Sequence, residues 1–222
     1  MDRPLLLKGP FFIMNTKDFL TLLAVSLLWG ASFLFLRLLV LDGLDPLQIV
    51  SIRMILAALF IAPFFIRKMK KHSFYEHGFS FLLIGMLNTA LPFTMFAYAS
   101  VSLGAGSLSI LQATVPILTA LILFTLYKGE FSYFKLSGVM IGFSGLFLLV
   151  GPSGNLDLFA SILCVVASLS YAIAGVYLAK TPARISNSFI GMGSIIVGAF
   201  LMAPFLLNYS NPFTTISATS WL

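Results

Sequence analysis

The chain has 222 residues, of which 59% are hydrophobic and only 9% are charged, with a formal net charge of +6 at pH 7. Soluble domains carry roughly 25% charged residues to cover their surface, so the composition excludes a soluble enzyme and a disordered chain. The basic charge lies in short loops rather than along one solvated face, and no nucleic-acid partner is expected. The sequence therefore predicts an integral membrane protein.

Seven apolar segments are candidates for membrane-spanning helices, which need about 20 mostly apolar residues to cross a hydrocarbon core about 30 Å thick. In chain order they are 19–41, 46–66, 79–99, 104–127, 133–150, 158–179 and 188–207. None of them shows the alternation of apolar and polar residues that a membrane β-barrel needs. The predicted fold class is all-α, a polytopic bundle of transmembrane helices.

The basic residues predict the orientation of this bundle. All Lys and Arg residues except Arg37 and Arg53 lie before the first span, in alternate loops or, for Lys135, at the start of the fifth span beside such a loop, so that they share one side. The loops of the opposite side carry Asp42, Asp45 and Asp157 and no basic residue. Because basic loops stay in the cytoplasm, the sequence predicts a multi-pass protein of the cell (inner) membrane with a cytoplasmic N-terminus and an outer tail after the last span.

The segment 1–18 is expected to be cytoplasmic. Its short apolar run has no small-residue cleavage site, and it is therefore not interpreted as a signal peptide. Met14 is followed by a polar lead-in to the first span and is the expected natural start of the protein.

An internal repeat links the second and the last span. Residues 56–66 align with 197–207 at an offset of 141, with identical residues at Pro63/Pro204 and at three further pairs, and Trp29 aligns with Tyr171 at an offset of 142. Chance similarity between apolar helices is the alternative explanation. If the match is a true repeat, its unit has five helices, and an odd number makes the two copies cross the membrane in opposite directions. Inverted repeats of this kind are typical of secondary transporters.

The repeat divides the chain into 19–151, a first five-helix unit, and 157–222, the first two helices of a second, inverted unit. Leu-Trp-Gly-Ala-Ser-Phe at 28–33, Pro46 with Arg53, Ala-Thr-Val-Pro at 113–116 and the glycine-rich stretch 138–151 resemble, in this order, the drug/metabolite transporter superfamily of the EamA type. The resemblance implies ten spans in two inverted repeats, and export of small metabolites. It would make the protein a permease that works by alternating access.

Spans eight to ten of such a transporter have no counterpart in 1–222. A fragment of a longer protein, a non-transporting truncated remnant, a packing subunit of a larger complex, and a bundle completed by a second copy or a separate chain all stay open. The nucleotide sequence beyond the codon of Leu222 would distinguish them.

Two arginines lie within predicted spans, where charged residues are costly and mark a function or a specific partner. Arg37 is near the outer end of the first span and is expected to extend toward the outer headgroups. Arg53 lies seven residues inside the second span, about 10 Å deep. It either extends to the headgroups in the same way or faces a cavity, where its guanidinium would bind a carboxylate or phosphate.

Uncharged polar and aromatic residues complete the predicted substrate pathway. Asn88 and Gln112 lie near mid-membrane, each shortly before a proline, Pro92 and Pro116, which frees a backbone carbonyl. They either line a polar cavity or form hydrogen bonds between helices. Trp29 and Tyr171 lie away from the interfacial belts and either form a cavity wall or fill packing space. The predicted pathway residues are Trp29, Arg53, Asn88, Gln112, Pro116 and Tyr171.

The predicted spans contain no Asp or Glu, no set of metal ligands and no catalytic pair. The sequence thus predicts no enzyme activity, metal or cofactor. The expected partners are membrane lipids and a small-molecule substrate.

Overall fold

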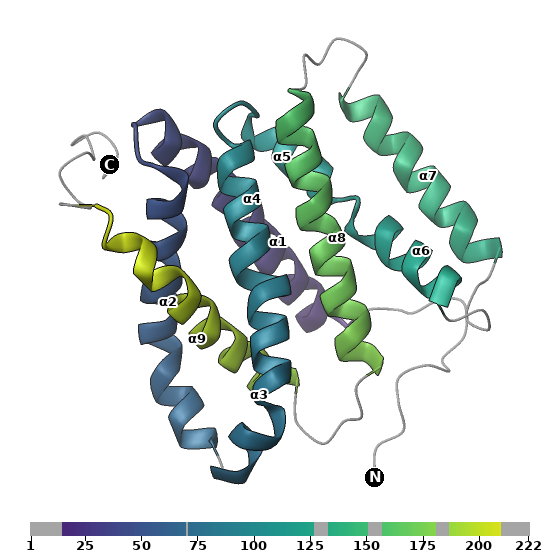
Figure 1. Cartoon of the computed structure of the whole chain (residues 1–222). Coiled ribbons are helices and arrows are strands. Elements are labelled where there is room, and N and C mark those ends of the chain that lie inside the picture. The colour runs from purple at the N-terminus through teal and green to yellow at the C-terminus, as the bar shows by residue number, and fades with distance from the viewer. Residues whose placement is uncertain (1–14, 70, 127–132, 151–156, 181–186, 210–222) are drawn as a thin grey trace.

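The computed structural model describes residues 15–69, 71–126, 133–150, 157–180 and 187–209. Residues 1–14, with the expected start at Met14, and the tail beyond 209 lie outside the described residues. All elements of the described chain are helices (Figure 1). They are α1 (Thr16–Leu41), α2 (Pro46–Lys68), α3 (Lys71–Gly85), η1 (Met86–Ala90), α4 (Leu91–Ala99), α5 (Ala105–Gln112), α6 (Val115–Leu126), α7 (Tyr133–Val150), α8 (Leu158–Lys180) and α9 (Asn187–Leu206).

The described chain contains six helical stretches that are long and apolar enough to cross a membrane. They are Thr16–Leu41, Pro46–Lys68, Gly78–Ala99, Ala105–Leu126, Leu158–Lys180 and Ser188–Leu206. Each coincides closely with a predicted span, and α7 has the bounds of the remaining one, 133–150. The predicted all-α, polytopic membrane bundle is confirmed.

The turn between α1 and α2 has the residues that such a reversal requires. Gly43 has a φ of 92°, a left-handed conformation that favours glycine. The Asp45 side chain accepts a hydrogen bond from the Leu47 backbone N–H at 2.8 Å, and Pro46 occupies the first position of α2. Both are favourable at a helix start, because the first N–H groups of a helix have no partner within it.

Two of the spans are interrupted at a proline. In the third span, the turn before Pro92 is a π-helix, η1, in which the Leu91 N–H bonds to the carbonyl of Met86. In the fourth span, α5 ends at Gln112 and α6 begins at Val115, immediately before Pro116. A proline cannot donate to the carbonyl four residues earlier, so each proline leaves the regular helix without one hydrogen bond.

Helices α2 and α9 pack against each other in opposite directions. At one end the Tyr209 hydroxyl bonds to the Asp45 carboxylate, and further along the Ser51 hydroxyl donates to the Met202 carbonyl at 3.0 Å. At the other end the Phe65 ring stacks on a ring of α9 at 4.9 Å. Figure 1 shows α9 running diagonally across α2. The hairpins that end at the matching prolines of α2 and α9 therefore cross the bundle in opposite senses.

Small residues bring α9 close to α3 and η1. A side chain at Gly193 would overlap the Phe81 ring, with a closest approach of 2.5 Å, and one at Gly198 would approach the Thr89 hydroxyl to 2.7 Å. Phe65, Phe81 and the Phe189 ring of α9 form a buried aromatic cluster beside this contact. We call it the aromatic end cluster.

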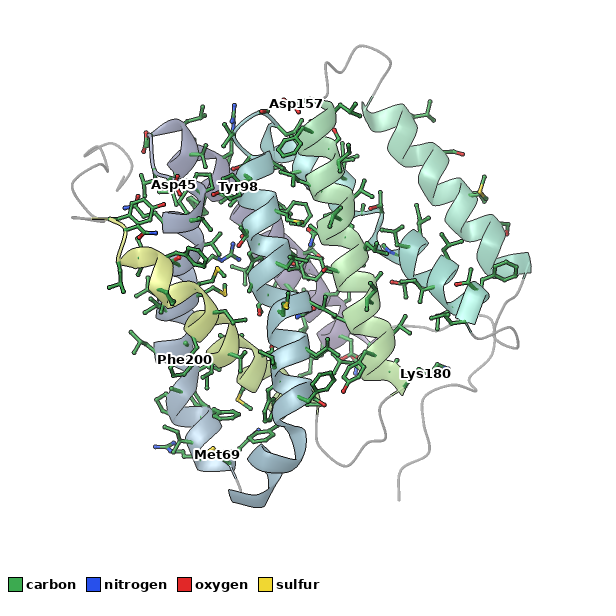
Figure 2. The ribbon with its side chains drawn as sticks, in the orientation of Figure 1. Asp45, Met69, Tyr98, Asp157, Lys180 and Phe200 are labelled. Carbon is green, nitrogen blue, oxygen red and sulfur yellow. The ribbon has the colours of Figure 1, made fainter. Side chains whose placement is uncertain are left out.

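The two ends of the bundle differ in charge and in packing. Asp45, Tyr98 and Asp157 lie at one end and Lys180 at the other (Figure 2). On α1, residues 16–30, which run from the Lys180 end, are exposed, whereas Phe33 and Leu36 nearer the Asp45 end are buried. The helices are thus packed more closely around α1 at the Asp45 end.

Candidate functional site

A cavity of about 800 Å³, widely open to the outside of the bundle, lies between α1, η1, the α5–α6 break and α8. Its lining combines aromatic, amide and hydroxyl side chains with the backbone of the two interrupted spans. The lining residues are Ser26, Trp29, Gly30, Phe33, Asn88, Ser109, Gln112, Ala113, Val115, Pro116 and Tyr171. The structure therefore brings five of the six predicted pathway residues into one cavity.

The sixth predicted residue, Arg53, lines a much smaller pocket of about 20 Å³ between α1, α2, α4 and α8. Trp29, Phe33 and Tyr171 line this pocket as well as the large cavity. The two spaces are therefore neighbours that share an aromatic wall, and Arg53 lies on the far side of it. We call the two spaces together the central site.

Arg53 faces other side chains rather than a carboxylate. The central carbon of its guanidinium lies 4.6 Å from the centroid of the Phe93 ring, a cation–π contact. Within the described ranges it makes no ion pair and no hydrogen bond, and it also borders a groove between α1 and α2. Of the two interpretations from the sequence, the geometry favours the one in which Arg53 faces a pocket.

Tyr171 carries a polar group that nothing satisfies. Its hydroxyl is buried and has no hydrogen-bond partner among the residues described. Its ring stacks on Phe96 at 6.4 Å, and its hydroxyl is close enough to Arg53 for an electrostatic interaction. A buried hydroxyl without a partner costs about 1–3 kcal/mol, so Tyr171 has a donor available for a water molecule or a ligand.

Asn88 and Gln112 line the large cavity with free amide groups. Neither side chain forms a hydrogen bond with another residue in the described part of the chain. The hydrogen bonds between helices that were the alternative interpretation of these amides are therefore not found there. Pro92 and Pro116 follow these two residues by four positions and have no N–H to donate. The backbone carbonyls of Asn88 and Gln112 therefore also lack their usual helical donor. Such groups within a membrane are tolerated where they line a wet cavity, and π-turns like η1 are frequent at functional sites.

Arg37 has a structural role that the sequence did not indicate. Instead of extending to the headgroups, it donates from Nη1 to the carbonyls of Ser100 and Val101, the latter at 2.8 Å. These carbonyls follow the end of α4, where a helix has unpaired acceptors and a partial negative charge. Arg37 thus holds α1 against the turn between α4 and α5.

Two phenylalanines beside Arg53 were not among the predicted pathway residues. Phe33 lies one helical turn after Trp29, on the same face of α1, and Phe93 directly follows the proline at 92. Both signals were present in the sequence, but a chain with 23 phenylalanines offers many such pairs. Only the packing of α1 and α2 against α4 distinguishes these two from the others.

Comparison with known proteins identifies relatives of the chain. The model of the EamA-like transporter family matches residues 16–151. An uncharacterized transporter of Archaeoglobus fulgidus is 29% identical over 226 residues, covering 94% of this chain and 75% of its own length. The uncharacterized transporter YoaV of Bacillus subtilis is 25% identical over 211 residues, covering 92% of this chain and 70% of its own. No solved structure matches significantly.

Proposed function

The chain belongs to the EamA-like transporter family and is a multi-pass membrane transporter, and from this premise we propose how it transports. It moves a small amphipathic metabolite out across the cytoplasmic membrane by alternating access. The substrate binds in the central site, with Trp29, Arg53, Asn88, Gln112, Pro116 and Tyr171 along its path. The Lys180 end faces the cytoplasm, because basic loops stay on that side.

The observation that carries this proposal is the pair of unpaired amides, Asn88 and Gln112, in a cavity of about 800 Å³. Ligand pockets usually measure about 300–1,000 Å³ and combine apolar walls with a few convergent polar groups. A structural role alone would not explain why two amides and a tyrosine hydroxyl have no partner among the described residues. Water and substrate are the partners that the proposal provides.

The contacts at the two ends of the α2–α9 pair support alternating access. The Asp45–Tyr209 hydrogen bond joins these helices at one end, and the aromatic end cluster joins them at the other. In the proposed mechanism one of the two contacts loosens while the other stays closed, so that the central site opens to one side at a time. The exposure of α1 over residues 16–30 fits a site that is open toward the Lys180 end.

An efflux assay tests this proposal without a known substrate. The full chain is reconstituted into liposomes that contain the small-molecule fraction of a cell extract, and the released compounds are identified by mass spectrometry. We expect at least one compound to leave faster than it leaves liposomes that contain the same extract but no protein. Asn88→Leu and Gln112→Leu should each slow its release at least tenfold.

Thr125→Val is the matched control, since the Thr125 hydroxyl bonds to a carbonyl of its own helix, Leu121, at 3.0 Å and does not line the cavity. It should transport like the unaltered protein. If neither amide substitution changes the rate of release, the proposal that the substrate passes through the central site is contradicted. Liposomes that release nothing would favour the non-transporting alternative.

A further inference from the structure

We propose that the substrate of the central site is a monocarboxylate with a ring-sized apolar body, held by its carboxylate between the guanidinium of Arg53 and the hydroxyl of Tyr171. The inference rests on the proposed function, since it names the substrate class of the same site. It follows from four properties of the site, which are its charge, its free donors, its dimensions and the nature of its walls.

The first property is an uncompensated positive charge. Arg53 contacts the ring of Phe93, and the described residues supply no carboxylate within ion-pair distance of it. The predicted spans contain no Asp or Glu at all. A charged group away from water normally has a partner of opposite charge. A bound anion would supply the partner that the protein lacks.

The second property is a hydrogen-bond donor beside this charge. Tyr171 lines the same small pocket as Arg53, and its buried hydroxyl bonds to nothing in the described ranges. A carboxylate has two oxygens, each of which accepts hydrogen bonds, and charge-assisted bonds to it are short and strong. One oxygen can bond to Arg53 and the other to Tyr171, which satisfies both groups with one ligand.

The third property is the difference in size between the two parts of the site. The pocket at Arg53 measures about 20 Å³, which gives room for one oxygen of a ligand headgroup in the place of a water molecule, whereas the adjoining cavity measures about 800 Å³. A small planar headgroup suits the narrow part better than a phosphate with its tetrahedral oxygens. A dianion would also leave one negative charge without a partner, so a single carboxylate is favoured.

The fourth property is the aromatic wall that joins the two parts. Trp29 and Phe33 line both spaces, and Phe96 stacks against the ring of Tyr171. A flat apolar body can stack on these rings while its carboxylate reaches Arg53. The amides of Asn88 and Gln112 line the large cavity, where they can bond to a small polar substituent of the body.

The same charge distribution disfavours zwitterions and cations. An ammonium group on the ligand would enter a site that has one positive charge and no acidic side chain among its lining residues. An amine would be repelled by Arg53 outright. Three compounds with the same ring therefore separate the possibilities, namely phenylpropanoate, phenylalanine and phenethylamine.

Binding to the purified full chain in lipid nanodiscs tests the inference independently of transport. The chain has two tryptophans, so Trp221→Phe leaves Trp29, in the wall of the site, as the reporter. We expect phenylpropanoate to change Trp29 emission with an affinity at least tenfold above that of phenylalanine, and phenethylamine to give no change. Equilibrium dialysis of radiolabelled phenylpropanoate provides a second readout.

Substitutions identify the two groups that hold the carboxylate. Tyr171→Phe should weaken phenylpropanoate binding roughly tenfold or more, the effect of losing one hydrogen bond to a charged group. Arg53→Gln should abolish it, and Arg53→Lys should restore part of it. Tyr177→Phe is the matched control on the same helix, because its hydroxyl pairs with Ser80 outside the central site at 2.8 Å; binding should be unchanged.

Equal affinity for the acid, the zwitterion and the amine would overturn the inference, as would full acid binding by Tyr171→Phe and Arg53→Gln. The result of the binding assay can be distinguished from the result of the efflux assay. Acid binding without efflux would retain the ligand class and contradict transport. Efflux of a compound that is not a carboxylate, together with no acid binding, would retain transport and contradict the ligand class.

Discussion

Arg37 and Arg53 are the two charged side chains within the first two spans, and their surroundings give them opposite roles. Arg37 neutralises the carbonyls of Ser100 and Val101 after the end of α4, so its charge is compensated by the fold. Arg53 faces the ring of Phe93, and no anionic partner accompanies it in the described residues. The first arginine contributes to stability, whereas the second, in the proposed function, keeps a binding group available at the expense of stability.

Removing the charge of Arg37 should therefore lower stability, whereas removing the charge of Arg53 should not. Arg37→Leu leaves two carbonyls without their donor and should lower the free energy of unfolding by about 1–3 kcal/mol. Arg53→Gln removes a charge without a partner and should leave stability unchanged or raise it, as replacement of poorly compensated buried charges often does. Thermal unfolding of both variants in the same detergent measures this. A melting temperature that falls equally for both would contradict the distinction.

Tyr209 gives the α2–α9 contact a dependence on pH. Burial and the hydrogen bond to Asp45 raise the pKa of the Tyr209 hydroxyl above its ordinary value of about 10. The hydroxyl is a donor only when protonated, and its pKa is higher in the folded chain than in the unfolded one. The stability that it contributes is therefore fully present below about pH 10 and is lost as the pH rises through the folded-state pKa.

Unfolding measured between about pH 7 and pH 12 tests this dependence. The difference in melting temperature between the unaltered chain and Tyr209→Phe should be constant up to about pH 10 and shrink above it. A difference that grows with pH would contradict the role of the Tyr209–Asp45 bond.

The interrupted spans are the elements that build the central site. Pro92 removes one helical donor, and the π-turn η1 that precedes it contains Asn88, whose side chain lines the cavity, and Thr89, whose hydroxyl bonds back to Gly85 beside α9. A π-turn contains one residue more than an α-helical turn, so it rotates the residues on its two sides relative to each other. The proline thus positions one side chain for the cavity while its neighbour faces α9.

Pro92→Ala should consequently disturb the site more than the fold. Alanine supplies the missing N–H and favours a continuous α-helix. Loss of the one extra residue in the π-turn would rotate Asn88 about the helix axis by about 100°, away from the cavity. We expect efflux to fall at least tenfold while the melting temperature stays the same or rises. Pro63→Ala in α2 is the control, since Pro63 also lies inside a helix but does not line the site. Loss of efflux in both variants would point to a general effect of proline.

The bounds of the helices could be predicted because the bilayer sets them. The stretch 133–150 was predicted to the residue, and the other spans differ by a few residues at the ends. The sequence also indicated Asn88 and Gln112, because an amide before a proline is unusual in an apolar span. It could not show that Arg37 bonds to the α4–α5 turn, or which phenylalanines surround Arg53. Those facts depend on the rotation and neighbours of each helix, which hydropathy does not encode.

On the scale of the whole molecule, the pairing of α2 with α9 is nearly symmetric about Leu56 and Val197, the first pair of residues that the internal repeat aligns. Ser51 bonds to Met202, and each of these lies five residues from its member of that pair, in opposite directions. Equivalent helices of an inverted duplication meet in this antiparallel way about a twofold axis in the membrane plane. The antiparallel contact of α2 with α9 is therefore the one expected between equivalent helices of the predicted inverted repeat.

A reversible cross-link at one end of this pair tests whether movement about the centre accompanies transport. In Asp45→Cys/Tyr209→Cys, a short cleavable bis-maleimide would join α2 and α9 where their side chains already touch. The natural cysteine, Cys164, is buried and should not react. If the Asp45 end must open once in every cycle, the cross-link should stop efflux while leaving binding to the central site intact, and cleavage should restore efflux.

Arg37→Cys/Val101→Cys, cross-linked in the same way, joins α1 to the α4–α5 turn and not to α9. Relative to its own efflux before cross-linking, this control should retain more efflux than the first pair, because it leaves the α2–α9 contact free to move. Undiminished efflux with α2 and α9 fully cross-linked would mean that substrate crosses without opening this end, and a rocking motion about Leu56 and Val197 would then have no part in transport.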